Sequence, residues 1–376
     1  MRLDLVKLLV RLLLKNAHIC KDLGTLNEPS NAQNELKNVC FFSNTAIGDS
    51  MFNTPVWSAF RAHYPSAKIV ALLHPSSASL FKNDSNIDEI LTYNGKWGGF
   101  FKTLKELKKR RFDAIFILHS NEPQATPLAV LSGARYIFKI PNDKNEFSAF
   151  HSNPKTALTR GQYAVKSRLQ VLSFVGINAN DTRMRLYLND DDFSKANALL
   201  EPLRAQKQGL EAKIIGFQMG ASVFSKFWIK DSWLAIAQKL LDDGHIIVLC
   251  GSLNERKFCS KISAQLANEC VLNAAGLLNL RGAAALIGSL DTLISVDTGI
   301  LHIAAALKTP TITLFGPTNP AELNPDFDTN IHIAITAPNA ASYYANHRGK
   351  DYSYLMKEIS VDMVHRALLS ILQATL

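Results

Sequence analysis

The chain has 376 residues, of which 47% are hydrophobic and 19% charged, so it can bury sizeable cores and is not a disordered chain. At about 100–200 residues per domain, this length suggests two or three domains. The net charge of +9 favours anionic partners, namely phosphates, anionic lipid or nucleic acid. No apolar stretch approaches the roughly 18–20 residues that span a bilayer, which argues against a transmembrane helix.

Residues 1–36 form an amphipathic N-terminal extension and linker. At helical period, Asp4, Lys7, Arg11 and Lys15 share one stripe, and leucines and valines fill the rest of the circumference. The two basic residues Lys7 and Arg11 interrupt any signal-peptide core. Two interpretations stay open: a helix lying on an anionic membrane, or a helix docked on the protein's own body. The polar residues 22–36 indicate a linker.

Two stretches of the chain then alternate between strand and helix patterns. Apolar, β-rich runs predict strands over 38–43, 68–73, 113–118 and 135–140, and again over 213–218, 246–250, 292–296 and 311–315. Helical patterns lie between them, over 50–63, 100–110, 231–243, 254–268, 279–288 and 300–307. This alternation predicts an α/β protein built from two doubly wound, Rossmann-like domains that face each other across a cleft.

The expected domains are 37–180 and 205–355, with a junction between about 175 and 210. A last amphipathic segment at 358–374, within a C-terminal part 356–376, is expected to pack back on the N-terminal domain. Ligands of open α/β sheets bind beyond the carboxyl ends of the strands, so the loops that follow strands are the informative ones.

The loop after strand 292–296 reads Asp297-Thr298-Gly299 and opens a helix. The first amides of such a helix carry positive partial charge and predict a diphosphate site, to which His302 could donate. The alternative is that Asp297 caps the helix and His302 is an ordinary surface residue. The loop 316–320, which follows the next strand at the same edge of the sheet, favours the phosphate site.

The loop after the first strand contains Thr45, Gly48 and Asp49. Gly48 permits a tight turn, and Asp49 lies at the mouth of the following helix. Asp49 is either a general base or an N-cap aspartate. This loop lacks the glycine pattern of a dinucleotide fingerprint, and no P-loop pattern occurs anywhere in the chain.

Two further loops of the second half carry polar side chains. Ser222, Ser225 and Lys226 are placed to meet phosphate oxygens, or else belong to a solvated loop. Glu255 opens a helix after strand 246–250, where a carboxylate could accept hydrogen bonds from ribose hydroxyls or act as a helix cap.

Three other features point to structure more than to chemistry. The D-x-D pattern at 190–192 precedes a helical pattern and is interpreted as a helix start, not as a metal ligand. The basic segment 96–111 is interpreted as a solvated helix face, or as an anionic acceptor surface; no recognition module for nucleic acid accompanies it. The chain has five cysteines, an odd number, and no C-x-x-C motif. This pattern predicts reduced, mostly buried thiols of a cytosolic protein.

The sequence resembles the bacterial heptosyltransferases of glycosyltransferase family 9. The segment VDTGILHIAAALKTPTITLFGPTNPAELNP matches most specifically, and IGDSMFNTPVWSAFRAHYPSAKI resembles the N-terminal signature of the family. Looser agreement in FDAIFIL and SKFWIKDSW extends the resemblance over about residues 38–325.

The resemblance implies a GT-B architecture and transfer of a heptose from ADP-heptose, or a related nucleotide sugar, to a lipid-linked core oligosaccharide of lipopolysaccharide. It further implies inversion at the anomeric carbon, no metal or cofactor, and a cytoplasmic enzyme with possible peripheral contact at the inner membrane. The family's base falls on Asp49, its lysine on Lys226, its ribose-binding acid on Glu255, and its phosphate site on Asp297, Thr298, Gly299 and His302.

The acceptor-binding half departs from the family pattern. Many members have an aspartate after the strand at 113–118, where this chain has His119-Ser120-Asn121-Glu122. Thr45, Gly48, His119 and Asn121 are therefore the candidates for the acceptor side. Two alternatives stay open: a GT-B enzyme that uses another nucleotide sugar, and a non-catalytic binding protein that retains the fold.

Overall fold

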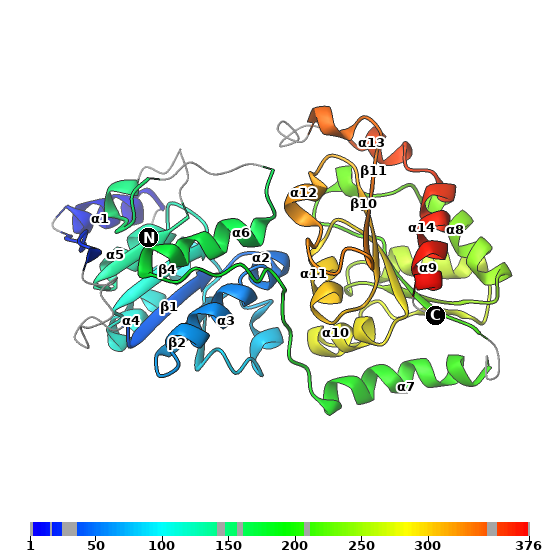
Figure 1. Ribbon diagram of the computed structural model, residues 1–376, viewed down its shortest axis with the longest axis horizontal. Coiled ribbons are helices and arrows are strands. Elements are labelled where there is room, and N and C mark those ends of the chain that lie inside the picture. Colours follow the sequence, from blue (N-terminus) through cyan, green and yellow to red (C-terminus); the bar gives the residue numbers. More distant parts are fainter. Residues whose placement is uncertain are drawn as a thin grey trace. The chain divides into compact units, whose positions relative to one another are not determined.

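The computed structural model describes residues 3–15, 17–24, 36–140, 147–155, 161–206, 211–343 and 352–374. The chain forms two compact units, Met1–Met184 and Arg185–Leu376 (Figure 1). This division falls inside the expected junction. Most of the expected linker at 22–36 lies outside the described residues.

The first unit is built on a five-stranded sheet in the order β3-β2-β1-β4-β5, in which every neighbouring pair is parallel. Its strands are β1 (Asn38–Ser43), β2 (Lys68–Leu73), β3 (Glu89–Thr92), β4 (Ala114–His119) and β5 (Tyr136–Lys139). Its helices are α1 (Leu3–Leu14), α2 (Ile47–Met51), α3 (Thr54–His63), α4 (Phe100–Arg110), α5 (Ala125–Leu131) and α6 (Ala164–Leu169).

Aromatic side chains fix the register of β1, β4 and β5, three neighbouring strands of this sheet. Phe41 of β1 pairs with Phe116 of β4, which pairs with Phe138 of β5. Their rings stack at centroid distances of 4.9 Å for each neighbouring pair. A slip by one residue would turn these buried rings to the opposite face, so the stack specifies how the carboxyl ends of the strands are aligned.

The second unit has a six-stranded parallel sheet in the order β11-β10-β9-β6-β7-β8. Its strands are β6 (Ile214–Gln218), β7 (Ile246–Cys250), β8 (Val271–Asn273), β9 (Thr292–Val296), β10 (Thr311–Phe315) and β11 (His332–Thr336). Its helices are α7 (Asp190–Gln206), α8 (Lys230–Asp242), α9 (Arg256–Leu266), α10 (Leu280–Gly288), α11 (Gly299–Ala306), α12 (Pro320–Leu323), α13 (Tyr354–Lys357) and α14 (Val361–Ala374).

The C-terminal helix corrects one expectation. Val364, Leu368 and Ile371 recur at helical spacing on α14 and are fully buried in the core of the second unit. The helix packs against α8, β10 and β11 (Figure 1). The expectation that this segment packs back on the N-terminal domain is therefore wrong, because its apolar stripe completes the sheet of its own unit.

The helix expected over 50–63 is two helices. α2 ends at Met51 and α3 begins at Thr54, with Pro55 in its first turn. Proline fits the first turn of a helix but removes a hydrogen bond from a helix interior, which explains the break. Within the described residues, no helix is both long and apolar enough to cross a membrane.

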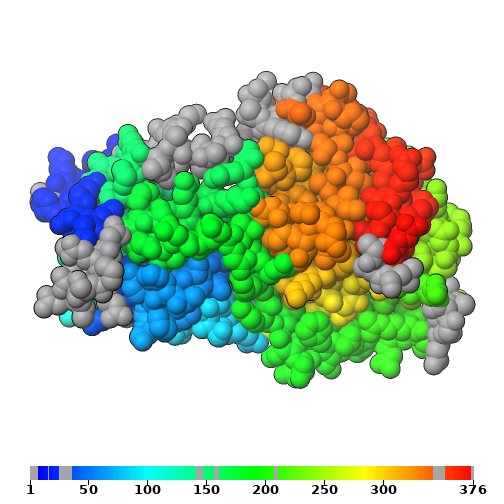
Figure 2. All heavy atoms as spheres, viewed as in Figure 1, coloured from blue at the N-terminus to red at the C-terminus, as the bar shows by residue number. Residues whose placement is uncertain are grey.

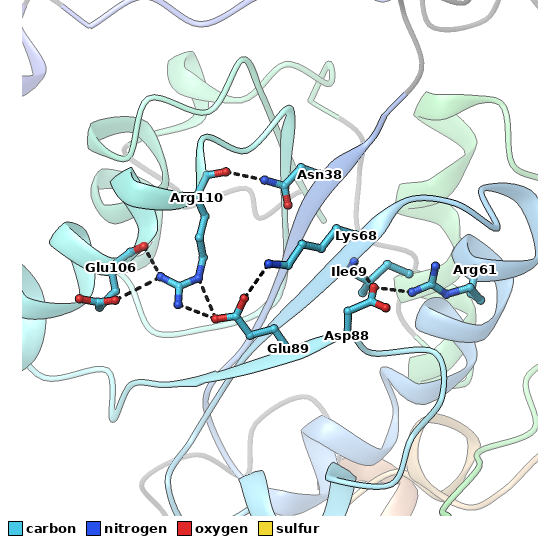
Figure 3. A network of polar contacts seen from close by, with 8 residues as sticks. All are labelled: Asn38, Arg61, Lys68, Ile69, Asp88, Glu89, Glu106 and Arg110. Atoms are coloured by element: carbon cyan, nitrogen blue, oxygen red, sulfur yellow. Dashed lines mark hydrogen bonds and ion pairs between the residues drawn. The ribbon is translucent and has the colours of Figure 1, made fainter.

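An ion-pair network closes the amino-terminal edge of the first sheet (Figure 3). Glu89, the first residue of β3, accepts a hydrogen bond from Arg110 Nε at 2.9 Å and pairs with Lys68 Nζ at 3.0 Å. Arg110, at the end of α4, holds the pKa of Glu89 below its ordinary value. Nearby, Arg61 pairs with Asp88 at 2.6 Å. Part of the basic segment 96–111 is thus structural, and it lies at the strand edge opposite to the one that carries the site.

The cysteines are free thiols, as expected. Cys40, Cys250, Cys259 and Cys270 are buried, and Cys20 is half-buried. Burial raises the pKa of both Cys250 and Cys259 to about 12, so these thiols stay protonated at neutral pH.

Candidate functional site

In the first unit, Asp49 collects three polar neighbours at the carboxyl ends of β1 and β4. Its Oδ2 accepts a hydrogen bond from Thr45 Oγ1 at 3.1 Å and lies 3.4 Å from His119 Nδ1. Its Oδ1 accepts a hydrogen bond from Arg168 Nη2 at 3.0 Å. Asp49 is the third residue of α2, whose N-cap residue is Ala46, so the N-cap alternative for Asp49 is wrong. A quarter of its side chain, 24%, remains accessible to solvent.

Arg168 is the partner of Asp49 that the sequence patterns do not reveal. It lies on α6, and its side chain is only 6% exposed. The guanidinium carbon is 4.8 Å from the centroid of the Phe52 ring, a cation–π contact. Its Nε and Nη1 are buried without a hydrogen-bond partner in the described part of the chain. Burial lowers the pKa of Arg168, and the Asp49 carboxylate opposes that shift, so Asp49 is the counter-charge of a buried guanidinium.

One signal in the sequence could have pointed to Arg168. Arg168 is the single arginine in a segment whose apolar residues Val165, Leu169 and Leu172 are buried. A charge in such a segment needs a partner, because an unpaired buried guanidinium is costly. The identity of that partner, 119 residues away, is visible only in the fold.

The four residues expected on the acceptor side have different positions. Thr45 Oγ1 lies 2.7 Å from His119 Nδ1, so both residues belong to the Asp49 cluster. Gly48 is buried inside α2 instead of forming a tight turn. Asn121 is exposed on the loop after β4 and lies against Gly95, where its Nδ2 would be 3.0 Å from an added Cβ. Gly95 adopts a positive φ of 72°, so a side chain there would be strained as well as crowded.

In the second unit, Lys226, Asp297 and Thr318 meet at the carboxyl edge of the adjacent strands β6, β9 and β10. Asp297 Oδ2 accepts a hydrogen bond from Lys226 Nζ at 2.6 Å and another from Thr318 Oγ1 at 2.8 Å. The Asp297 side chain is only 5% exposed, whereas Lys226 is 19% exposed. The buried carboxylate therefore positions a partly accessible ammonium group at the end of the sheet. We call Lys226, Asp297 and Thr318 the lysine cluster.

Helix α11 begins directly beside Asp297. Thr298 is its N-cap residue, Gly299 its first residue, and the Thr298 side chain makes no capping hydrogen bond. Asp297 is thus committed to the lysine cluster, and the capping alternative is wrong. His302 is buried at 3% exposure, so the alternative of a surface histidine is wrong too. The first amides of a helix carry positive partial charge, which is the basis for the predicted phosphate site at this end of α11.

Glu255 joins the loops that follow β6 and β7. It is the N-cap residue of α9, but its side chain does not cap that helix. Instead Oε2 accepts hydrogen bonds from Ser252 N and Ser252 Oγ, both at 2.7 Å, and Oε1 accepts one from Gln218 Nε2 at 2.9 Å. A Cβ on Gly220 would lie 1.9 Å from Glu255 Oε1, so this close approach requires glycine.

The remaining candidates lie on the loop between β6 and α8. Ser222 is exposed and Ser225 is half-buried, one residue before Lys226. The tip of the loop presents apolar side chains: Phe224 is 69% exposed and Val223 is 49% exposed. The same loop therefore carries two serine hydroxyl groups close in sequence to Lys226, and its surface is accessible to solvent.

Among the described residues, no group of three or more His, Cys, Asp or Glu side chains is placed to hold a metal ion. The D-x-D pattern begins α7, as expected for a helix start. Asp192 accepts hydrogen bonds from the buried Arg281, with Nε at 3.0 Å from both of its oxygens. This part of the chain therefore has a structural role.

Comparison with known proteins identifies similar sequences in one family. The family model for glycosyltransferase family 9 (heptosyltransferase) matches residues 100–352. Lipopolysaccharide heptosyltransferase 3 of Escherichia coli is 26% identical over 72% of this chain and 80% of its own. Lipopolysaccharide core heptosyltransferase OpsX of Haemophilus influenzae is 23% identical over 87% of this chain and 95% of its own.

The fold has a close counterpart among solved structures. The structure of E. coli ADP-heptose lps heptosyltransferase II covers 90% of this chain and all of its own, with a TM-score of 0.71 at 20% identity. The two Rossmann-like parallel sheets and this likeness confirm the expected GT-B fold class. Since the family model spans well over half of the chain, this protein belongs to glycosyltransferase family 9, the heptosyltransferases.

Proposed function

We propose that this protein transfers a heptose from ADP-heptose to a core oligosaccharide of lipopolysaccharide or lipooligosaccharide, with inversion and without a metal ion. The observation that carries the proposal is the lysine cluster beside the N-terminus of α11. The named activities of the similar enzymes of E. coli and H. influenzae support the choice of sugar and acceptor.

The second unit is suited to hold the diphosphate of the donor. A nucleoside diphosphate is a good leaving group that needs its developing charge stabilised more than it needs a proton. The Lys226 ammonium and the first amides of α11, from Gly299 onward, supply fixed positive charge. Ser222 and Ser225 add hydroxyl groups on the same loop, and His302 lies in the first turn of α11.

The groups that follow β7 and β8 are suited to the nucleoside. Leu253 is 71% exposed and Leu277 is 44% exposed, which leaves apolar surface for a base. The two loops touch, since a Cβ on Gly276 would lie 2.8 Å from Leu253 Cα. Glu255, two residues after Leu253, offers a carboxylate to ribose hydroxyls once its bonds to Ser252 and Gln218 rearrange.

Asp49 of the first unit is proposed as the general base. It would take the proton of the acceptor hydroxyl as that oxygen attacks the anomeric carbon of the heptose and the bond to the ADP oxygen breaks. A single displacement of this kind inverts the anomeric centre. Thr45 and Arg168 hydrogen-bond to the two oxygens of the carboxylate, and His119, at 3.4 Å from Asp49, is proposed to contact the acceptor.

We further propose that the protein is cytoplasmic and works at the cytoplasmic face of the inner membrane, because its proposed acceptor is linked to lipid. The net charge of +9 supports contact with an anionic surface. A nucleotide-sugar donor belongs to the same compartment.

The test begins with the melting temperature of the purified chain in the presence of ADP, UDP, GDP or CMP. A ligand at ~100 times its dissociation constant stabilises the folded state by about 2.7 kcal/mol. A selective shift with ADP, followed by transfer from ADP-heptose with an inverted anomeric product in the presence of a chelator, is the expected result. Preference for another nucleotide would overturn the donor, and loss of transfer with the chelator would overturn metal independence.

A further inference from the structure

Helix α1 is docked on the first unit by a narrow contact. Val10 and Leu14, one turn apart, are 2% and 5% exposed and belong to the same hydrophobic core as Leu128 of α5. After the helix, the Cys20 amide donates a hydrogen bond to the Arg135 carbonyl at 3.2 Å. The docked interpretation of the N-terminal helix is therefore confirmed, and its orientation on the unit is defined.

The outward side of the same helix is also apolar. Leu8, Leu9, Leu12 and Leu13 are 55%, 37%, 48% and 52% exposed, respectively. At 3.6 residues per turn, Leu8 and Leu12 lie roughly opposite the docked Val10 and Leu14. Figure 2 shows the spheres of α1 at the surface of the first unit. A helix that only docks turns its leucines inward, so these four, which we call the leucine face, need another explanation.

Three cations flank the leucine face. Lys7, Arg11 and Lys15 are exposed and recur every four residues, so they form one stripe along α1. This stripe lies between the docked side of the helix and the leucine face. The combination of an apolar face and a basic flank is the pattern of helices that lie in the headgroup region of an anionic bilayer.

We propose that the leucine face and its basic stripe are a membrane-docking surface for anionic lipid. The leucines would enter the boundary between headgroups and acyl chains, and Lys7, Arg11 and Lys15 would contact lipid phosphates. A second copy of the chain fits less well, because it would bring the same three cations to the contact. This docking surface rests on the proposed function, since a lipid-linked acceptor is presented at a bilayer.

The experiment measures sedimentation of the full chain with vesicles of phosphatidylglycerol and phosphatidylcholine, compared with phosphatidylcholine alone. The wild type is expected to bind the anionic vesicles and to be released by high salt. Leu8→Gln/Leu12→Gln should weaken binding at least ~10-fold, because two inserted side chains are lost. Lys7→Gln/Arg11→Gln/Lys15→Gln should remove the preference for anionic vesicles.

Leu369→Gln is the matched control, because Leu369 of α14 is 43% exposed and lies outside the proposed surface. It should bind vesicles as the wild type does. The melting temperatures of all variants should stay close to that of the wild type, since every substituted side chain is exposed. Equal vesicle binding by the wild type and the leucine variant would overturn the proposal, and so would no binding by the wild type. A wild-type dimer that is lost in the leucine variant would also overturn it.

Failure of this inference and failure of the proposed function give different results. Transfer of heptose to a water-soluble acceptor fragment should be the same in the wild type and in both α1 variants. Vesicle binding without any transfer would overturn the proposed function alone. Normal transfer without vesicle binding would overturn the docking surface alone.

Discussion

Arg168 Nη2 donates a hydrogen bond to Asp49 Oδ1 at 3.0 Å, and it does so from a position where the guanidinium is almost fully buried. The carboxylate proposed as the base is thus also the counter-charge of a buried cation. This relationship joins α2 to α6 and links the chemistry of Asp49 to the stability of the first unit. It also means that a substitution at Asp49 changes two properties at once.

Asp49→Asn should remove most of the transfer activity. A general base contributes typically ~10²–10⁴-fold to a rate, and the amide cannot accept the acceptor proton. The affinity for ADP should be nearly unchanged, because the residues proposed to bind the nucleotide lie in the second unit. Steady-state transfer rates and ADP-induced melting shifts measure the two effects separately. Asp362→Asn, at an exposed position on α14, is the control; turnover like that of the wild type in Asp49→Asn would sink the assignment.

Asp49→Asn should also lower the free energy of unfolding, by ~2 kcal/mol. Removing one partner of a buried ion pair costs about 3–5 kcal/mol, and the partial exposure of Asp49 reduces that figure. Adding Arg168→Met in the Asp49→Asn background should restore stability without restoring transfer, because no buried charge then remains unpaired. Urea unfolding of the two single variants and the double variant measures this coupling. Additive losses in the double variant would show that the two residues do not stabilise each other.

Strands whose residues are almost all buried could be predicted from the sequence, including β5 at one edge of the first sheet, whereas three other edge strands could not. β1, β2, β7, β9 and β10 have the expected bounds, because buried parallel strands are continuous apolar runs. The edge strands β3, β8 and β11 are short and largely half-buried, so their residues give no such run. Their place depends on pairing with β2, β7 and β10, which is a tertiary property.

The candidate site residues, too, could be predicted only in part from the sequence. The loops that carry Asp49, Lys226, Glu255 and Asp297 could be predicted, because parallel strands present their carboxyl ends at one edge. The partners of these residues could not. Neither the Lys226–Asp297 contact nor the Asp49–Arg168 contact has a spacing rule, since each joins residues that are distant in the sequence. Helix capping is the default local interpretation at these positions. For Asp49 it is excluded because Ala46 is the N-cap residue, and for Asp297 because its carboxylate binds Lys226 and Thr318.

Lys226→Ala should weaken binding of ADP about 10-fold and slow transfer by more, because charge develops on the diphosphate as the donor bond breaks. Binding of adenosine, which has no phosphate, should be unchanged. Lys239→Ala on α8 removes a more exposed lysine and serves as the control. Calorimetric titration with ADP and adenosine measures both affinities. An equal loss for the two ligands would indicate a distorted loop instead of a lost phosphate contact.

Glu89→Gln should make the first unit less sensitive to acid below about pH 4.5. Hydrogen bonding and charge from Arg110 and Lys68 hold the pKa of Glu89 below its ordinary value of 4.5. The stabilisation that ionised Glu89 gives to the folded state is therefore fully present above pH 4.5. It is lost as the pH falls through the lower pKa that Glu89 has in the folded state. Thermal melts at several acidic pH values should show a shallower decline for the variant than for the wild type. Parallel curves would mean that the contacts of Glu89 in Figure 3 contribute nothing measurable.

His151 should control stability in a different pH window, between about pH 6.5 and 3. Burial, together with the charges of Lys139 and Lys21, lowers the pKa of His151 from 6.5 to about 3. Within this window the unfolded chain binds a proton that the folded chain does not. The free energy of unfolding therefore falls as the pH falls, by at most ~1.4 kcal/mol per pH unit, and is level above pH 6.5.

His151→Gln removes that proton while keeping a side chain that can bond to Thr126 Oγ1, which lies 3.0 Å from His151 Nε2. The variant should be somewhat less stable at pH 7 and should lose less stability than the wild type between pH 6.5 and 4.5, above the range where Glu89 titrates. Urea unfolding across this range measures the two slopes. His365→Gln, at a histidine on α14 next to Asp243, tests whether the effect is specific to the buried ring. Equal slopes for the wild type and His151→Gln would mean that the folded chain accepts the proton at His151 as readily as the unfolded chain does.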